Sequence, residues 1–354
     1  MYTTVAFVIV LGVLIFFHEL GHFLVARLFG VGVEKFSLGF GPKLFAKTIG
    51  KTEYRVSSIP LGGYVKMVGE DPDADIAPED KAVSFTHQHV LKRICIVAAG
   101  PFFNLLLAVI IFFGIFLTSG SYILQPVVGG VREGSPAAGA GIQEGDLVKA
   151  VDGRSVTDWE EMAEIISDCR GRRLRFVVER NDIEFELLVT PELAQSKNIF
   201  GENVDRYLIG ISASGDIVVN ELSFFQAFSE SVRQTYSISK LTIISIAKLI
   251  QGTISTKTLG GPIMIAEMAG QQAKEGPGHL IFFIALLSIN LAILNFLPIP
   301  VLDGGHLLFF FIELVTGRPV NMKMRVVAQQ IGVMILIMLM LFVFYNDIMR
   351  VFFE

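Results

Sequence analysis

The sequence has little charge and almost no cysteine for its length, and each shortage narrows the class of protein. Only 18% of the 354 residues are charged, whereas 52% are hydrophobic and the mean hydropathy is +0.58. Soluble globular chains carry about 25% charged residues, so this balance indicates contact with lipid. The net charge of −5 comes without a dense block of Lys or Arg, which argues against nucleic-acid binding. Two cysteines, Cys95 and Cys169, are too few for a disulfide framework.

The N-terminus also lacks a basic segment and a small-residue cleavage site, so it does not resemble a signal peptide. Instead, residues 4–26 form an apolar run long enough to cross a bilayer. Three further runs of this kind are predicted at about 94–117, 280–302 and 326–345. We therefore predict an α-helical polytopic membrane protein with four transmembrane helices.

Basic residues near the ends of the spans set the expected orientation. Ten Lys and Arg residues lie between the first two spans, and Arg318, Lys323 and Arg325 lie between the last two. Both of these links are therefore expected in the cytoplasm. The two termini and the polar middle region are expected on the outer side, since long domains cross a membrane regardless of their charge.

The polar middle region has the pattern of a small folded domain. Residues 125–192 alternate short apolar strands with Gly and Pro turns, and residues 159–168 have helical spacing of apolar side chains. The run from Ser135 to Asp146, followed by Val151-Asp152-Gly153, resembles a PDZ domain of the bacterial protease type. Such domains bind extended chain ends by edge addition. Any other small β-rich domain is the alternative.

The chain is accordingly divided into four parts. Within residues 222–250, aromatic and aliphatic side chains recur at near-helical spacing, but the uncharged stretch between Lys240 and Lys248 is too short to cross a bilayer. We interpret this segment as an amphipathic helix on the membrane surface, with a fifth span as the less favoured reading. The predicted parts are a first transmembrane pair (1–120), an inserted α+β PDZ-like domain (121–195), a connection with the amphipathic helix (196–279) and a second transmembrane pair (280–354).

The first span contains His18-Glu19-Leu20-Gly21-His22, which is an H-E-x-x-H sequence. Histidines four residues apart lie on one face of a helix, so both imidazoles can bind a single zinc ion. Glu19 is placed to take a proton from water at the metal without binding the metal. Because polar side chains are costly inside a membrane span, three of them together indicate a site, and we expect a metal centre here. Two buried histidines that only pack between helices are the alternative.

A tetrahedral zinc ion also needs a third ligand from the protein if its fourth position holds water. Asp303 follows a span interrupted by Pro298 and Pro300, and the two glycines after it let the backbone approach a metal closely. His306 is the rival candidate, since imidazole is the commoner zinc ligand. The spacing alone does not choose between Asp303 and His306.

These motifs together resemble the site-2 protease family of intramembrane zinc metalloproteases, specifically its bacterial RseP-like branch. The resemblance covers essentially the whole chain. Besides the H-E-x-x-H sequence and the PDZ-like insert, it rests on the segments GFGP (39–42), GGYVKM (62–67), GPFFN (100–104), LGGP (259–262) and NFLPIPVLDGG (295–305). This branch often carries two tandem PDZ domains, whereas the middle region here holds one clear copy.

The resemblance implies one zinc ion per chain, held by His18, His22 and Asp303 rather than His306, with Glu19 as the catalytic base. It implies a zinc metalloendopeptidase of the bacterial cytoplasmic (inner) membrane that has no organic cofactor. Its expected substrates are single-pass membrane proteins, cut within or near the transmembrane segment. An anti-sigma factor and remnant signal peptides are examples from the family.

Further residues are expected to contact the substrate. Asn295 is expected to stabilise the oxyanion and Asn104 to line the same cavity, with hydrogen bonding or packing between helices as the alternative for each. A substrate helix must unwind before it can be cut, because its amides are hidden in internal hydrogen bonds. We expect Tyr64, Val65, Lys66 and Met67 to lie on a β-hairpin that dips into the membrane and pairs with the unwound strand. An ordinary cytoplasmic hairpin is the alternative.

Two other classes of function compete with the protease. The first is a non-catalytic scaffold in which zinc fixes the helices and the PDZ-like domain recruits partners. A degenerate member of the family should have lost its base, yet Glu19 is present. The second is a metal transporter, which usually shows internal repeats and polar groups on several spans. Neither feature is visible in this sequence.

Overall fold

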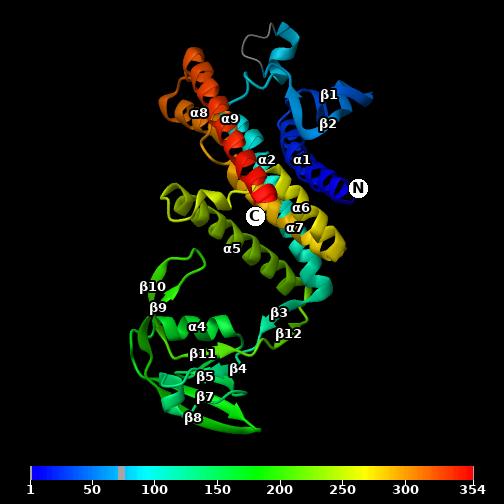
Figure 1. The fold of residues 1–354 in the computed structure, drawn as a ribbon. Helices are drawn as coiled ribbons and strands as arrows, with labels where there is room; N and C mark the ends of the chain where they lie inside the picture. The colour runs from blue at the N-terminus through cyan, green and yellow to red at the C-terminus, as the bar shows by residue number, and fades with distance from the viewer. Residues whose placement is uncertain (1, 71–75, 354) are drawn as a thin grey trace. The chain divides into compact units, whose positions relative to one another are not determined.

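The chain folds into two compact units, and it passes from the first unit into the second and back twice. The computed structural model describes residues 2–70 and 76–353. The first unit combines Met1–Ile115, Phe228–Leu249 and Ser255–Glu354, and the second combines Phe116–Ala227 with Ile250–Ile254. Figure 1 follows the chain through both units from the N-terminus to the C-terminus. The polar middle region is therefore an insertion into a helical unit.

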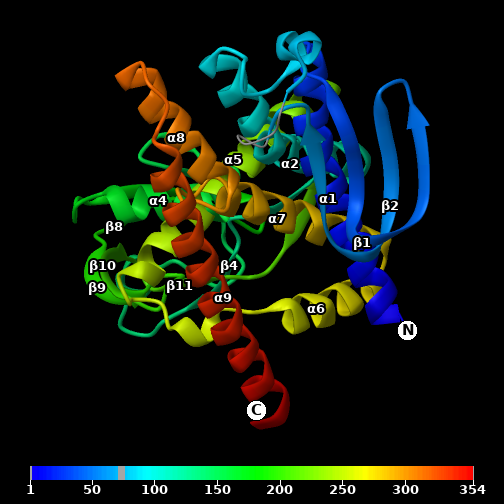
Figure 2. The same cartoon turned by 90° about the horizontal axis from the view of Figure 1, so that it is seen from above.

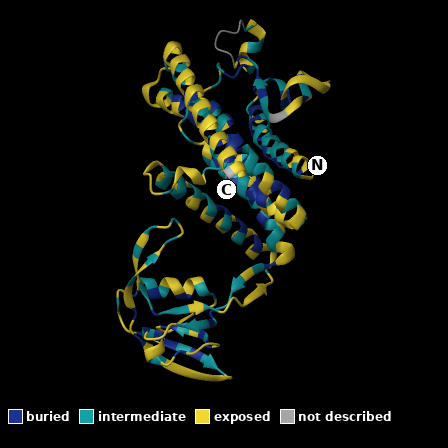
Figure 3. Cartoon of the chain, viewed as in Figure 1, coloured by how far each residue is buried: buried dark blue, intermediate teal, exposed yellow. Residues whose placement is uncertain are grey.

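Four helices of the first unit are long and apolar enough to cross a membrane, within the part of the chain that the structure describes. An α-helix rises about 1.5 Å per residue, so about 20 residues span the hydrocarbon layer. Figure 3 shows that α9 is exposed along most of its length, as lipid-facing surface would be. The predicted number of helices that could span a membrane is confirmed: α1 (Tyr2–Leu28), α2 (Val90–Ser119), α7 (Pro277–Asn295) and α9 (Met322–Phe353).

The third predicted span and the link after it differ from the structure. Helix α7 ends at Asn295 rather than near residue 302, because Pro298 and Pro300 lack an amide hydrogen and disfavour helical geometry in the residues before them. Helix α8 (Asp303–Thr316), which was not among the predicted elements, fills most of the link between the last two spans. At 14 residues, α8 is too short to span a bilayer, so it does not stand out in the sequence as a long apolar run.

A buried group of charges ties α8 to two of the spanning helices. The guanidinium of Arg93 on α2 donates to Glu313 on α8, and both side chains are almost fully buried. Arg325 on α9 approaches the second oxygen of Glu313, with Nη2 3.6 Å from Oε2. Removing one member of such a group leaves a buried charge unpaired, so the group fixes how these helices pack.

The Leu259-Gly-Gly-Pro262 segment forms the start of helix α6 (Pro262–Glu275), with Gly261 as its N-cap residue. The carboxylate of Asp347 on α9, which is fully buried, accepts hydrogen bonds from the amides of Gly261, Ile263 and Met264 at 2.9, 2.9 and 3.2 Å. A carboxylate is the favoured partner for the unpaired amides at a helix N-terminus. A Cβ atom on Gly261 would lie 2.6 Å from this carboxylate, so glycine is required there.

Helix α5 (Phe224–Ile250) matches the predicted amphipathic helix. It turns hydroxyl groups inward, because Ser231 and Thr235 are buried whereas Phe225 and Tyr236 are exposed. Thr242 Oγ1 hydrogen-bonds to the Asn290 side chain on α7 at 2.9 Å. Helix α5 is absent from the four candidate spans, so the described residues give no support to a fifth span; its place at the membrane surface stays a prediction.

The predicted hairpin is present as two long strands, β1 (Val33–Ile49) and β2 (Thr52–Met67), beside α1 (Figure 2). Each strand bends, so one segment of β1 has neighbours on both sides: Phe36 pairs with Val65 and also with Tyr54. The bend in β1 occurs at Gly39, whose φ of 89° is unfavourable for other residues. Residues 63–67 consequently form one edge of the folded hairpin.

The second unit is a small α+β fold, as predicted. Its four-stranded antiparallel sheet has the order β6-β5-β7-β8, and the apolar face packs on α4 through Met162, Ile166 and Phe176. Strand β11 pairs with β4 and β12 pairs with β3, so the predicted domain boundary at residue 195 falls inside this unit. Its elements are β3 (Ser121–Leu124), β4 (Val128–Val131), α3 (Pro136–Ala140), β5 (Leu147–Val151), β6 (Arg154–Ser155), α4 (Trp159–Asp168), β7 (Leu174–Arg180), β8 (Ile183–Val189), β9 (Glu192–Lys197), β10 (Asn203–Leu208), β11 (Ile211–Ala213) and β12 (Ile217–Asn220).

The PDZ-like sequence run is accounted for by local structure. Ser135 caps the N-terminus of α3, and Gly141 ends this helix in a left-handed conformation with φ 86°. The buried Asp146 carboxylate accepts two hydrogen bonds from Arg180, at 2.6 and 2.8 Å. These hydrogen bonds raise the pKa of the Arg180 guanidinium above its usual value. The identity of the unit as a PDZ domain stays a prediction.

Candidate metal centre

Helix α1 brings the two histidines of the H-E-x-x-H sequence together. The Nε2 atoms of His18 and His22 lie 3.3 Å apart, and their rings are nearly perpendicular at 87°. His22 is buried, and the His18 side chain is 13% exposed. Their spacing of four residues places both on one helical face. Two nitrogen donors are thus held side by side within an apolar helix.

Asp303, the first residue of α8, completes the group. Its Oδ2 atom lies 3.2 Å from His18 Nε2 and 3.6 Å from His22 Nε2. The segment between α7 and α8 crowds the start of α8: a Cβ atom would lie 2.2 Å from the Leu297 carbonyl oxygen if added to Gly304, and 2.4 Å from the Ile299 oxygen if added to Gly305. The two glycines therefore let α8 begin deep enough for Asp303 to reach the histidines.

The three donor atoms fit a tetrahedral zinc ion. Zinc binds nitrogen and oxygen at about 2.0–2.1 Å, which puts neighbouring donors of a tetrahedron about 3.3 Å apart. The observed separations of 3.2, 3.3 and 3.6 Å match that edge length. Asp303 Oδ2 is also buried with no hydrogen-bond partner among the described residues, as a metal-binding oxygen would be. His306 is not part of the group of candidate metal ligands found in residues 2–70 and 76–353.

Helix α2 forms the wall behind the two histidines. His22 Nδ1 lies 2.9 Å from the carbonyl oxygen of Ile96 and donates to it, which leaves Nε2 free to bind a metal. Gly100 lies directly against both rings, since a Cβ atom there would be 2.3 Å from His22 Nε2 and 2.9 Å from His18 Cε1. Sequence reasoning missed Ile96, because a backbone carbonyl has no signature in the sequence.

The hairpin edge approaches Glu19. A Cβ atom on Gly63 would lie 3.0 Å from Glu19 Cγ, so this part of β2 runs directly past the carboxylate side chain. Along the edge, Val65 and Met67 are buried in a core that includes Phe36. Tyr64 and Lys66 are half-buried on the other face. An extended chain beside this edge would therefore meet the backbone of all four residues, but only the side chains of Tyr64 and Lys66.

The two asparagines occupy different positions. Asn104 on α2 is fully buried, and its amide nitrogen lies 3.4 Å from His18 Nδ1. The hydroxyl of Ser288 on α7 donates to the Asn104 backbone carbonyl at 2.7 Å. Asn295 is half-buried at the end of α7. The hydrogen bonds of the described chain do not connect the Asn295 side chain to the three candidate ligands.

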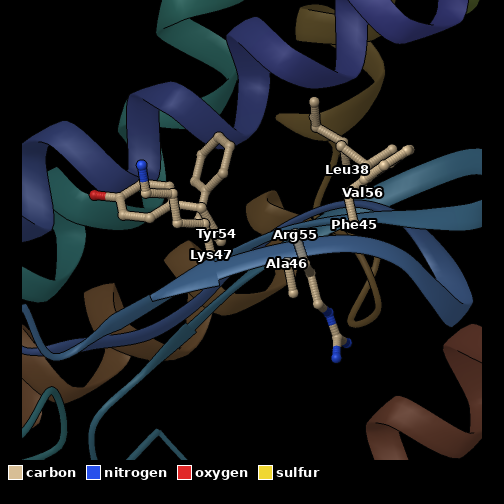
Figure 4. Close-up of a pocket in the computed structure, with 8 residues that line it drawn as sticks. Leu38, Phe45, Ala46, Lys47, Tyr54, Arg55 and Val56 are labelled. Atoms are coloured by element: carbon tan, nitrogen blue, oxygen red, sulfur yellow. The ribbon is translucent and has the colours of Figure 1, made fainter. Parts of the chain in front are cut away.

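A separate apolar cavity of about 390 Å³ lies on the folded hairpin (Figure 4). Its lining comes from β1 and β2 and includes none of the predicted metal ligands. Figure 4 shows the Arg55 side chain pointing away from the ring of Tyr54. The lining residues are Phe36, Leu38, Phe45, Ala46, Lys47, Tyr54, Arg55 and Val56.

Comparison with known proteins gives consistent matches along the chain. The model of peptidase family M50 matches residues 6–339. A protein named as a zinc metalloprotease in Agrobacterium fabrum is 38% identical over 357 residues, covering 97% of this chain and 95% of its own length. One so named in Campylobacter jejuni is 38% identical over 349 residues, covering 98% and 93%. The regulator of sigma-W protease RasP of Bacillus subtilis is 30% identical over 426 residues, covering 99% of both chains.

Proposed function

Because this chain belongs to peptidase family M50, the site-2 protease family, we propose that it cuts single-pass membrane proteins within or near their transmembrane segments. It is a zinc metalloprotease of the membrane, since the family match extends over nearly the whole chain and four helices suit a bilayer. We assign the zinc ligands to His18, His22 and Asp303 and the catalytic base to Glu19. The observation that carries the assignment is the meeting of three donor atoms at 3.2–3.6 Å between apolar helices.

The proposed chemistry needs little beyond these four side chains. When bound, zinc supplies a Lewis acid that acidifies water and polarises a peptide carbonyl. Glu19 takes a proton from the attacking water and passes it to the departing amine, so the carboxylate is regenerated. Asn295 is proposed to donate to the oxyanion through its amide group. The position of Asn295 supports this role, because it is the last residue of α7 and the segment that follows it leads to Asp303 at the start of α8.

Substrate binding is proposed to use the edge formed by residues 63–67. A transmembrane helix hides its amides until it unwinds, and an added strand satisfies them again through ladder hydrogen bonds. The closeness of Gly63 to Glu19 supports this site, since a strand added there would carry its peptide bonds past the base. Tyr64 and Lys66 would then contact substrate side chains, while Val65 and Met67 would contribute only their backbone.

The arrangement in the membrane follows from charge. The basic residues between α1 and α2 and around the start of α9 favour a cytoplasmic position for both links. Both termini and the second unit are then outside the cytoplasm. In this arrangement, the second unit is proposed to limit entry to substrates whose outer portion has already been shortened.

Cleavage by the purified full chain tests this function. A single-pass substrate in lipid vesicles is incubated with the native protein, with Glu19→Gln and with a zinc chelator. We expect cuts within the membrane segment from the native protein, and a loss of about 10²–10⁴-fold in rate for Glu19→Gln, the usual contribution of a general base. Glu133→Gln, the same change at an exposed position of the second unit, is the matched control and should cut at the native rate.

The result separates the protease from a zinc-stabilised scaffold. Unimpaired cleavage by Glu19→Gln would show that the base is wrongly assigned. Tight binding of one zinc ion without cleavage of any single-pass substrate would favour the scaffold instead.

A further inference from the structure

Asn104 has an unmatched polar atom next to the metal centre. Its side-chain oxygen Oδ1 is buried with no hydrogen-bond partner in the described chain, while its amide nitrogen faces His18 Nδ1 at 3.4 Å. Buried amide groups normally use both their donor and their acceptor. The complete burial of this residue also argues against direct contact with a substrate. The orphaned acceptor therefore needs another explanation.

The position of His18 Nε2 determines whether His18 Nδ1, the nitrogen beside Asn104, carries a hydrogen. His18 Nε2 points to Asp303 Oδ2 at 3.2 Å and to His22 Nε2 at 3.3 Å, so it faces the proposed zinc position. A neutral imidazole that binds metal through Nε2 carries its hydrogen on Nδ1. That hydrogen needs an acceptor. The Asn104 amide group lies beside Nδ1, and its oxygen can accept the hydrogen bond if the amide is turned over.

We propose that Asn104 is a positioning residue for the zinc site. Its side-chain oxygen Oδ1 accepts a hydrogen bond from His18 Nδ1–H. Half a turn about the last side-chain bond exchanges the oxygen and nitrogen of the amide and moves no backbone atom. This exchange gives the orphaned oxygen a donor and fixes the tautomer and ring orientation of His18. The inference rests on the zinc site proposed above.

The same helix provides the equivalent contact for the other histidine. His22 Nδ1 donates to the carbonyl oxygen of Ile96, eight residues before Asn104. Eight residues are about two helical turns, so both acceptors lie on one face of α2, with Gly100 midway between them. Helix α2 thus holds each imidazole from behind, by a backbone oxygen in one case and an amide oxygen in the other.

Three variants of the full-length protein test the proposal. Asn104→Leu keeps the size of the side chain but has no acceptor, whereas Asn104→Asp keeps an acceptor. Ser288→Ala is the matched control, because its hydroxyl contacts the Asn104 backbone carbonyl and not the amide group. Zinc affinity is measured in detergent by competition with a chelator, and the visible absorption of bound Co²⁺ reports the ligand geometry.

We expect Asn104→Leu to weaken zinc binding about 10–100-fold, the usual effect of losing an outer hydrogen-bond partner of a metal ligand. Asn104→Asp and Ser288→Ala should stay within about threefold of the native affinity and keep the native Co²⁺ spectrum. Native affinity in Asn104→Leu would overturn the proposal, since Asn104 would then only fill space. Equal losses in the Leu and Asp variants would overturn it too. Absence of zinc binding by the native protein would instead refute the metal site itself, and the inference with it.

Discussion

Gly100 is the position where a single methyl group should dismantle the metal centre. Its ideal Cβ atom lies 2.3 Å from His22 Nε2 and 2.9 Å from His18 Cε1. The φ angle of Gly100 is not positive, so alanine causes no backbone strain there. The whole effect of Gly100→Ala should therefore come from contact with the two imidazoles.

The size of the effect follows from these distances. Carbon atoms in contact prefer a separation of about 3.5 Å, so the His22 ring would have to move by about 1 Å. Metal–ligand distances tolerate only about 0.2 Å. His22 then fails as a ligand, and we expect zinc affinity to fall about 100-fold or more, beyond the loss of an outer hydrogen bond.

The control is Gly12→Ala on α1, where no atom lies within 4 Å of the added Cβ. Both variants gain the same helix propensity, about 0.5–1 kcal/mol, so only the contact with the imidazoles separates them. Zinc affinity by chelator competition and helix content by circular dichroism are measured on both. Native zinc affinity in a folded Gly100→Ala protein would refute the reasoning, as would an equal loss in Gly12→Ala.

Three further predictions concern stability. Asp347→Ala leaves the amides at the start of α6 without their acceptor, so the free energy of unfolding in detergent should fall by about 1–3 kcal/mol; an unchanged value would mean that water replaces the carboxylate. Glu313→Ala removes the carboxylate that pairs with the buried guanidinium of Arg93 and lies near that of Arg325, which should cost about 3–5 kcal/mol, and the double variant with Arg93→Met should recover part of it. Arg180→Met should lower the Tm of the second unit. Because Asp146 raises the pKa of Arg180, its charge and its contribution persist up to that raised pKa, so the loss in Tm should be the same from about pH 6 to 9; a loss that varies over this range would contradict the assignment.

The sequence by itself determined the parts of the molecule that depend on local patterns. Long apolar runs specify spanning helices because lipid demands internally satisfied backbone and apolar side chains. The spacing of His18 and His22 places two candidate ligands on one helical face, whatever the rest of the fold does. Alternating apolar residues and glycine turns likewise predicted the small α+β insert and a hairpin at residues 62–67, but not the length of its strands.

Local patterns misjudged the segment after α7. Two prolines ended the helix earlier than the apolar run did, and α8 was too short to be recognised as a membrane element. The choice between Asp303 and His306 also lay beyond spacing, because both lie in the first turn of α8. Only the resemblance to a family favoured Asp303 before the structure brought its carboxylate to the histidines.

Tertiary structure alone decided the contacts made by residues far apart in the sequence. Asp303 meets His18 across 285 positions, and Ile96 and Asn104 reach the histidines from a different helix. Backbone carbonyls and close approaches at glycine leave no periodic signal, since they depend on which helices pack together. The hydrophobic pattern therefore specified the helices, while their packing brought together the residues proposed to bind zinc.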